Sequence, residues 1–323
     1  INELPDLASK VQVGLFNILQ EGDVQIKGYP VRLRLDVLLC FSANPEDYTA
    51  RGKIITPLKD RIGSEIRTHY PRSRQDAMAI TAQEAWVDRR GDAPGGIAVE
   101  VPPFVREIVE EVAFQARGDQ KVDKRSGVSQ RLPITAIENV VSNAERRALA
   151  NGEGLAVPRV SDIYAALPSL TGKIELEYEG ELKGAEHVAR ELVRQAVATV
   201  FDGYAVTVDP RAIVEWFDRG GSLELSDTSP AADLLAAVDR IAGFDRVATA
   251  IGARAEDANA LRASVADFIL EGLYALKRIS RTDDGKLMGA PAPARPRPDA
   301  RSVESLLDDD DEPAGKGKKK YYN

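Results

Sequence analysis

The stretch Val37-Leu38-Leu39-Cys40-Phe41-Ser42-Ala43-Asn44-Pro45 decides how this sequence is interpreted. Its first five residues are apolar, and a polar segment with Pro45 ends the run. Such a run is typical of a strand buried on both faces of a parallel sheet, and it predicts that Cys40 is a small buried hydrophobic residue. Ligands of open α/β sheets bind beyond the carboxyl ends of the strands. We therefore expect Ser42 and Asn44 to lie at a functional site.

The residues before this run predict a helix and then a β-hairpin. Apolar residues recur at helical spacing over residues 9–20, and Ser9 can cap the first turn. Residues 24–35 alternate between apolar and polar side chains around a turn signal at residues 27–30, which places Tyr29 at the hairpin tip. The start of the chain therefore predicts a mixed α/β region.

Composition excludes several classes of protein. One cysteine and two histidines rule out an internal disulfide framework and a cysteine-based zinc cluster. A net charge of −8, from 43 basic and 51 acidic residues, argues against broad nucleic-acid binding. No apolar run approaches the roughly 20 residues that a membrane-spanning helix requires. These features favour a cytoplasmic protein with no membrane or nucleic-acid partner, and the length suits about two domains.

From about residue 101 the pattern is almost wholly helical. Helices are predicted from Pro103 onward, over residues 134–148 and over residues 161–167, which gives a helical unit at 99–170. A further, mostly helical domain is expected at 171–282. Its predicted helices lie near residues 188–200, 210–219, 231–243 and 256–278, and residues 173–181 predict a strand or an extended connector.

The composition changes after residue 282. Residues 289–298 read GAPAPARPRP, and an acidic block at 308–312 precedes a lysine-rich block at 316–320. Opposed charge blocks with almost no apolar residues cannot bury a core. We therefore expect a disordered charged tail at 283–323.

Four short motifs follow one another in the first 131 residues. They are Ile1-Asn2-Glu3-Leu4, the strand that ends at Asn44, Pro57-Leu58-Lys59-Asp60-Arg61-Ile62, and Ser126-Gly127-Val128-Ser129-Gln130-Arg131. Their order resembles the second half of an AAA+ ATPase core, with a Walker B end, a sensor 1 strand, an arginine-finger element and a sensor 2 element. The helix and hairpin between the first two motifs resemble the branch that holds the MoxR proteins and the ATPase subunit of magnesium chelatase.

This resemblance implies an α/β fold at residues 1–98, the C-terminal part of an αβα P-loop core with a β-hairpin insertion. It further implies that residues 99–170 are a helical lid. ATP and Mg²⁺ are the implied ligands, and a homo-oligomeric ring is the implied assembly, with each nucleotide between two subunits.

The resemblance also implies a role for each candidate residue. Glu3 would orient the attacking water, and Asn44 would bridge that water and the γ-phosphate. Arg61 would reach the nucleotide of the neighbouring subunit, because negative charge spreads over the γ-phosphate oxygens during phosphoryl transfer. Arg131 would contact the phosphates from the lid. Asn2 would bind the nucleotide and, weakly, its Mg²⁺.

The sequence departs from the family pattern at two points. Asn2 stands where the family has an aspartate, and a neutral amide holds Mg²⁺ less well than a carboxylate. The phosphate-cradling GxxxxGK[ST] loop is absent from these residues. We therefore expect the sequence to be a fragment whose upstream part carries this loop, and that it does not hydrolyse ATP alone.

Each candidate residue also has a simpler interpretation. Glu3 can be an ordinary exposed carboxylate, and Asn44 before a proline can be a turn residue. Arg61 can pair with a nearby acid such as Asp60 or Glu65, and Arg131 can simply begin a helix.

Several functions are compatible with the motifs. The first is a ring ATPase that remodels a partner protein, for which the MoxR resemblance implies a partner with a von Willebrand A domain. The second is the ATPase subunit of magnesium chelatase, which drives metal insertion into a porphyrin. The others are a sigma-factor-interacting AAA+ activator, although its GAFTGA loop is missing, and a scaffold that holds ATP with little turnover.

Overall fold

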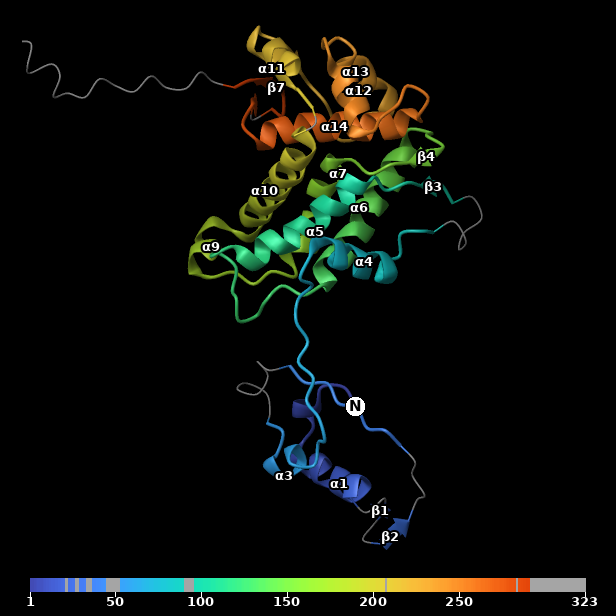
Figure 1. The fold of residues 1–323 in the computed structure, drawn as a ribbon, viewed down its shortest axis with the longest axis vertical. Coiled ribbons are helices and arrows are strands. Elements are labelled where there is room, and N and C mark those ends of the chain that lie inside the picture. Colours follow the sequence, from blue (N-terminus) through green and yellow to red (C-terminus); the bar gives the residue numbers. More distant parts are fainter. Residues whose placement is uncertain are drawn as a thin grey trace, which may run out of the picture.

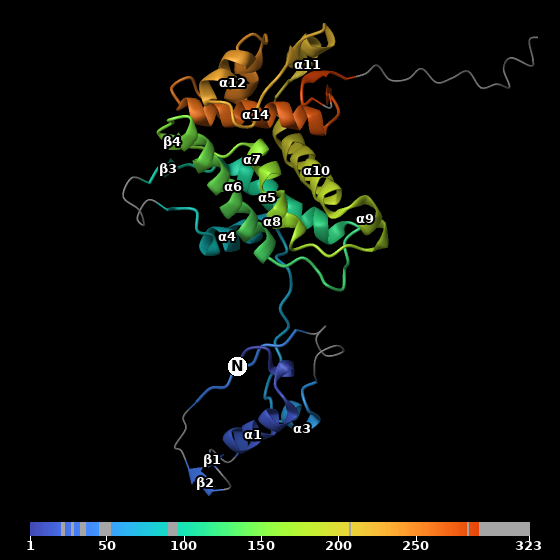
Figure 2. The same ribbon diagram turned by 180° about the vertical axis from the view of Figure 1, so that it is seen from behind.

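The computed structural model describes residues 1–20, 23–26, 29–32, 37–44, 53–89, 96–206, 208–282 and 284–290. Residues 1–62, here called the N-terminal part, and residues 73–290, the helical body, are joined by the connecting segment at 63–72 (Figures 1 and 2). The described residues form a mixed α/β fold that is mostly helical, with three small sheets. No helix among them combines the length and apolar composition that crossing a bilayer requires.

The N-terminal part contains the helix and the hairpin that the sequence predicts. Helix α1 occupies the predicted residues, and strands β1 and β2 pair antiparallel with Val24 opposite Val31. The predicted turn residues 27–28 and the hairpin residues 33–36 lie outside the described residues. The elements are η1 (Leu4–Asp6), α1 (Ser9–Gln20), β1 (Asp23–Ile26), β2 (Tyr29–Arg32) and α3 (Thr56–Lys59).

A buried glutamine joins α1 to the segment before α3. Gln12 is 1% exposed, and its Nε2 donates to the carbonyls of Leu7 at 2.9 Å and Lys53 at 3.2 Å. Its Oε1 accepts from the Ile55 amide at 3.0 Å. A buried side-chain amide with all these partners offsets its desolvation cost and fixes the two segments together.

The prediction of a buried strand at residues 37–41 is wrong for the described residues. No strand is formed there, Leu38 is 89% exposed, and Cys40 is exposed instead of buried. Among the described residues, this segment makes backbone hydrogen bonds with residues 1–4, and Leu39 and Phe41 are only partly buried. An apolar run indicates a buried strand only where other elements cover it.

The helical body is built around three long helices, α5, α10 and α14, that pack against one another in its centre. Its helices are α4 (Arg74–Glu84), α5 (Pro103–Gly118), α6 (Arg131–Ala150), α7 (Val160–Ala165), α8 (Leu167–Thr171), α9 (Tyr178–Lys183), α10 (Ala185–Ala205), α11 (Arg211–Asp218), α12 (Ala231–Val238), α13 (Phe244–Ile251) and α14 (Asn259–Ala275). Its strands are β3 (Ala98–Val99), β4 (Leu155–Ala156), β5 (Ser222–Leu223), β6 (Ile279–Arg281) and β7 (Leu287–Gly289).

An aromatic cluster marks the point where the three long helices meet. Phe268 of α14 stacks on Phe104 of α5 with ring centroids 4.3 Å apart. Phe201 and Tyr204 of α10 meet the same ring edge-on, at 5.3 and 5.5 Å. Gly272 allows this approach, because a Cβ there would lie 2.2 Å from the Phe201 ring. Such contacts add to the hydrophobic stabilisation of the core.

The boundaries observed in the structure differ from the expected ones at 98/99, 170/171 and 282/283. Helix α4 packs on α5, and β3 pairs parallel with β4, so residues from about 73 already belong to the helical body. One hydrophobic core runs from Phe104 to Leu287, so the expected lid and C-terminal domain share it. Strand β7 lies between β5 and β6, and residues 284–289 are therefore part of the fold. Residues 291–323, with the predicted charge blocks, lie outside the described residues.

Residues 173–181 form neither a strand nor a simple connector. A single bridge joins Leu176 to Val122, and α9 begins two residues later. Gly180 lies so close to Lys121 that a Cβ would be 2.6 Å from its carbonyl oxygen. The apolar and polar side chains alternate in this stretch, but the structure forms one bridge and then a short helix there, and no paired strand.

Candidate functional site

The chain start and the segment around Ser42 lie side by side and run parallel. The terminal amine of Ile1 donates to the Cys40 carbonyl at 2.8 Å, and the Ser42 amide donates to the Ile1 carbonyl at 3.0 Å. The Leu4 amide donates to the Ser42 carbonyl at 2.9 Å. In parallel strands one residue bonds to two residues of its neighbour in this manner. The structure thus brings Asn2 and Glu3 beside the segment that leads to Asn44.

Glu3 has an unusual backbone conformation. Its φ of 52° and ψ of 56° place it in the left-handed region, which few residues other than glycine adopt. Its amide donates to Ser42 Oγ at 3.0 Å, and the following Leu4 is fully buried. Local strain of this kind persists where surrounding contacts hold it, and it is found most often at functional sites.

Ser42 is the residue that connects the two candidates at the chain start. Its hydroxyl accepts from the Glu3 amide and donates to Asn2 Oδ1. A hydroxyl supplies one donor and two acceptor positions, so it can make both contacts at once. Asn44 follows two residues later and is exposed. Ser42 was expected at the site because of its place after an apolar run, but its double contact depends on residues 39 and 40 positions away.

Asn2 can offer Mg²⁺ one side-chain oxygen, which already has a partner. Among the described residues, no group of three or more His, Cys, Asp or Glu lies where it could hold a metal ion. Asn2 Oδ1 already accepts from the Ser42 hydroxyl, which leaves one lone pair for a further ligand. Mg²⁺ at nucleotide sites is held mainly by phosphates and water, with one or two protein oxygens. Asn2 therefore fits Mg²⁺ only as a minor ligand beside a bound nucleotide.

Arg61 is exposed and lies against α1 of its own chain. Its Nε donates to Gln20 Oε1 at 3.0 Å, and its Nη1 donates to the Pro57 carbonyl at 2.7 Å. Its guanidinium also lies over the Phe16 ring, 5.1 Å from the centroid. Among the residues that the structure describes, Arg61 forms no ion pair with Asp60 or Glu65, and Glu65 pairs with Arg67.

Arg131 lies in the other part of the molecule. It is the exposed first residue of α6, which agrees with its predicted place at a helix start. Helix α6 belongs to the helical body, whereas Asn2 and Glu3 lie in the N-terminal part (Figure 1). The described residues thus bring Asn2 and Glu3 together with the Ser42 segment, and leave Arg61 and Arg131 at separate positions.

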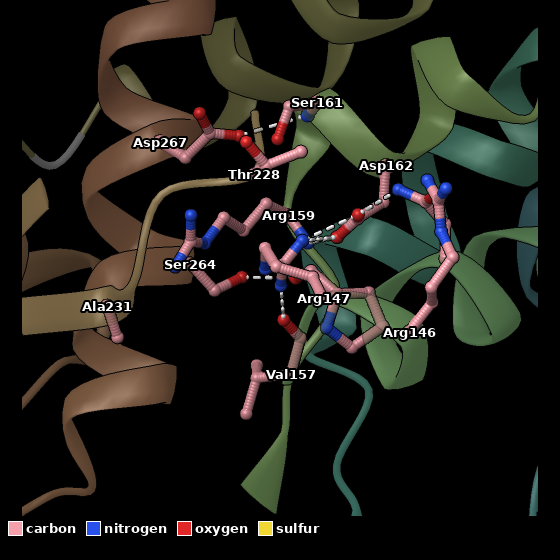
Figure 3. Close-up of polar contacts among 12 residues, drawn as sticks. Arg146, Arg147, Val157, Arg159, Ser161, Asp162, Thr228, Ala231, Ser264 and Asp267 are labelled. Carbon is pink, nitrogen blue, oxygen red and sulfur yellow. Dashed lines mark hydrogen bonds and ion pairs between the residues drawn. The ribbon is translucent and has the colours of Figure 1, made fainter. Parts of the chain in front are cut away.

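A buried ionic cluster occurs where α6, α7 and α14 meet (Figure 3). Arg147 and Asp162 form an ion pair at 2.5 Å, with both side chains almost fully buried. Asp162 Oδ2 also accepts from the Arg159 amide at 2.7 Å, and Arg147 Nη2 donates to the Val157 carbonyl at 2.7 Å. Buried charges need partners of this kind, because an unpaired charge in a core is very costly.

Two acidic residues of α14 extend this cluster. Asp267 accepts from the Ser161 amide at 3.0 Å, and burial raises the pKa of its carboxyl above the ordinary value. One turn later, Glu271 pairs with Arg281 of β6, and burial raises the pKa of Glu271 to about 7. Perturbed carboxyls can mark functional sites, but ion-pair networks that hold a fold together perturb them as well. Here each carboxylate joins two elements of the core, which indicates a structural role.

Sequence reasoning missed this cluster. Asp162, Asp267 and Glu271 interrupt apolar helical faces, and that interruption was the available signal. Apart from the Arg159 amide, which is three positions from Asp162, the partners named here lie 10 to 106 positions away along the chain, so most of the pairing could not be read from spacing.

Comparisons with known proteins do not assign the chain to a family. No family model, no curated protein and no solved structure matches it. The site is therefore interpreted from its own geometry, and the pairing of the chain start with the Ser42 segment is the feature on which a functional proposal can stand.

Proposed function

We propose that the N-terminal part is one half of a nucleotide-hydrolysing site in a ring-forming AAA+ protein that remodels a partner protein. The observation that supports this most is the parallel pairing of Ile1–Leu4 with Cys40–Ser42. The proposed Walker B end and sensor 1 segment must be neighbouring and parallel if Glu3 and Asn44 are to act on one water molecule. The left-handed conformation of Glu3 adds support, because it sets a carboxylate on a strained, tightly held turn.

In this proposal each side chain contributes positioning or charge. Glu3 orients the water, and Asn44 supplies an amide that can both donate and accept. Arg61 acts on the nucleotide of a neighbouring subunit, for which its exposed guanidinium is available once it leaves the Gln20 oxygen. Arg131 approaches from the helical body. A bound nucleotide with Mg²⁺ would supply the phosphoryl group and neutralise part of its charge.

The proposal has two further requirements. The phosphate-cradling loop is not among these 323 residues, so it has to come from a segment outside them. The partner protein has to meet a surface that moves with the site. Tyr29, 77% exposed at the start of β2, lies on the hairpin and is our candidate for that contact. A partner with a von Willebrand A domain is proposed on the resemblance to MoxR proteins alone.

The test measures ATP turnover by the full-length protein in which these residues occur. Glu3→Gln and Arg61→Ala should each reduce kcat, by 100-fold or more for Glu3→Gln and by about 10³-fold or more for Arg61→Ala. Glu65→Gln and Arg67→Ala are matched controls, since these two exposed side chains pair with each other. They should leave turnover unchanged.

Mixing the two inactive variants tests whether the site lies between subunits. An interface that takes Glu3 from the Arg61→Ala subunit and Arg61 from the Glu3→Gln subunit is intact, so mixed rings should regain part of the activity. Wild-type turnover by both single variants, or no recovery in mixed rings, would contradict the proposal.

A further inference from the structure

The connecting segment touches the helical body through one aromatic side chain. Residues 63–69 are extended and exposed, with Ile66 87% exposed. Tyr70 is 48% exposed, but the guanidinium of Arg117 lies over its ring, 4.3 Å from the centroid. The Tyr70 hydroxyl accepts from the Val128 amide at 3.1 Å. The segment is thus fixed to the body beside the loop that ends at Arg131.

Arg117 holds the same loop from the other side. Its Nε donates to the Val128 carbonyl at 3.0 Å, and its Nη2 donates to Gln130 Oε1 at 3.1 Å. The Val128 backbone is therefore bound at its N–H by Tyr70 and at its carbonyl by Arg117. The guanidinium of Arg117 lies over the Tyr70 ring, where a cation–π interaction favours it.

The polar chain continues into the core of the body. Gln130 Nε2 donates to Glu110 Oε2 at 3.0 Å, and Thr81 of α4 donates to the other oxygen of this carboxylate. Glu110 is 1% exposed, and burial raises its pKa. Residue 130, directly before Arg131, is therefore fixed to α4 and α5 by its side chain.

Gly127 is needed for this close approach. Its φ of +69° lies in the left-handed region, and a Cβ there would lie 2.4 Å from the Tyr70 hydroxyl oxygen. A side chain at this position would be strained and would also displace Tyr70. The loop and the connecting segment thus fit each other only with glycine.

From these contacts we propose that Tyr70 is a latch that binds the connecting segment to the Gly127–Arg131 loop and so sets the position of Arg131. Tyr70 and Arg117 are positioning residues, which act through Arg131. The role of Arg131 toward a nucleotide rests on the proposed function, whereas the latch itself does not.

Hydrogen exchange of the full-length protein tests the latch without any nucleotide. Tyr70→Phe keeps the ring but removes the acceptor of the Val128 amide, so this amide should exchange about 2- to 10-fold faster. Gly127→Ala should accelerate the whole loop up to residue 131. Ile66→Ala is the control, because Ile66 lies on the same connecting segment and is 87% exposed. Unchanged exchange at residue 128 in both Tyr70→Phe and Gly127→Ala would overturn the proposal.

ATP turnover then tests whether the latch acts through Arg131. Tyr70→Phe should raise KM for ATP several-fold with a smaller change in kcat, and it should have no further effect in an Arg131→Ala background. Additive effects in the double variant would overturn the link to Arg131. If the wild type hydrolyses no ATP, the proposed function fails, and the exchange experiment still decides the latch.

Discussion

The two parts of the molecule differ in where their order comes from. The helical body holds one continuous core from Phe104 to Leu287, with a cluster of buried ion pairs inside it. Among its described residues the N-terminal part has few fully buried apolar side chains, of which Leu4 and Leu58 are examples, and Val37 and Leu38 are exposed. The described residues of the body therefore share an extended apolar core, whereas the described contacts that hold the candidate site are mostly hydrogen bonds.

The candidate site at residues 1–4 and 40–44 is thus positioned by few described contacts. A strained residue such as Glu3 requires support from its surroundings, and here the described support includes the Ser42 contacts, the Asp6 amide bonded to the Glu3 carbonyl, and the burial of Leu4. Two probes separate the parts experimentally. Both tryptophans, Trp86 and Trp216, lie in the body, and the only cysteine, exposed Cys40, lies in the N-terminal part.

The largest effect is expected from Phe268→Ala in the centre of the body. This side chain is fully buried, and its truncation leaves a cavity among three aromatic rings. The free energy of unfolding should fall by about 3–5 kcal/mol. Urea unfolding followed by tryptophan fluorescence measures it, and Leu149→Ala, at a 63% exposed leucine of α6, should change it by less than about 0.5 kcal/mol. Equal effects of the two changes would contradict the single core.

The next effect is a pH dependence of the body that comes from Glu271. Its pKa is raised to about 7 by burial, whereas an unfolded chain releases this proton near pH 4.5. Between these values the folded state binds more protons, so the free energy of unfolding should fall as pH rises from about 4.5 to about 7. At about 1.4 kcal/mol per pH unit the loss amounts to about 3 kcal/mol.

Glu271→Gln removes this titrating group. The free energy of unfolding of the variant, again from tryptophan fluorescence, should change less over the same pH range. Glu186→Gln is the control, because the exposed Glu186 pairs only with Arg190 in the described contacts. A pH profile that Glu271→Gln leaves as steep as in the wild type would refute the assignment.

The sequence predicts local structure well where one helix face is buried, as in α5, which begins at the predicted Pro103 and buries its predicted apolar face. Helix α1 also begins and ends at the predicted residues, although Gln12 is its one buried side chain among those described. Apolar residues at helical spacing are enough for this, because the pattern and the packing have the same period. The strand at 37–41 shows the limit, since its apolar side chains do not say whether any element covers them.

Long-range pairing could not be predicted in the same way. The Ser42 hydroxyl meets residues 39 and 40 positions away, and Asp267 meets Ser161 across 106 positions. Strand β7 was not predicted, because it is only three residues long and follows a polar turn. Its buried side chain is Leu287. Such contacts depend on which elements the whole fold brings together, and neither periodicity nor composition contains that information.

A smaller effect is expected at the candidate site itself. Ser42→Ala removes the acceptor of the Glu3 amide and the donor to Asn2. In the full-length protein kcat for ATP should fall about 10- to 100-fold, equivalent to about 1.4–2.7 kcal/mol, because a misplaced group loses much of its effect. Ser42→Thr keeps a hydroxyl and should retain most of the activity. Tryptophan-detected unfolding should be the same in all three proteins, and full activity of Ser42→Ala would argue against the role of this hydroxyl.

In the 323-residue chain the smallest effect is expected from Leu38→Ala, and its size tests whether other elements cover this segment. With 89% of Leu38 exposed, its truncation in the 323-residue chain should change the stability of the N-terminal part by less than about 0.5 kcal/mol. A fluorescent label on Cys40 reports that part during urea unfolding. The proposed AAA+ core requires further strands beside this segment, so the same change in the full-length protein should cost about 2–3 kcal/mol. Equal, negligible costs in both chains would mean that nothing covers Leu38, and the N-terminal part would then not belong to such a core.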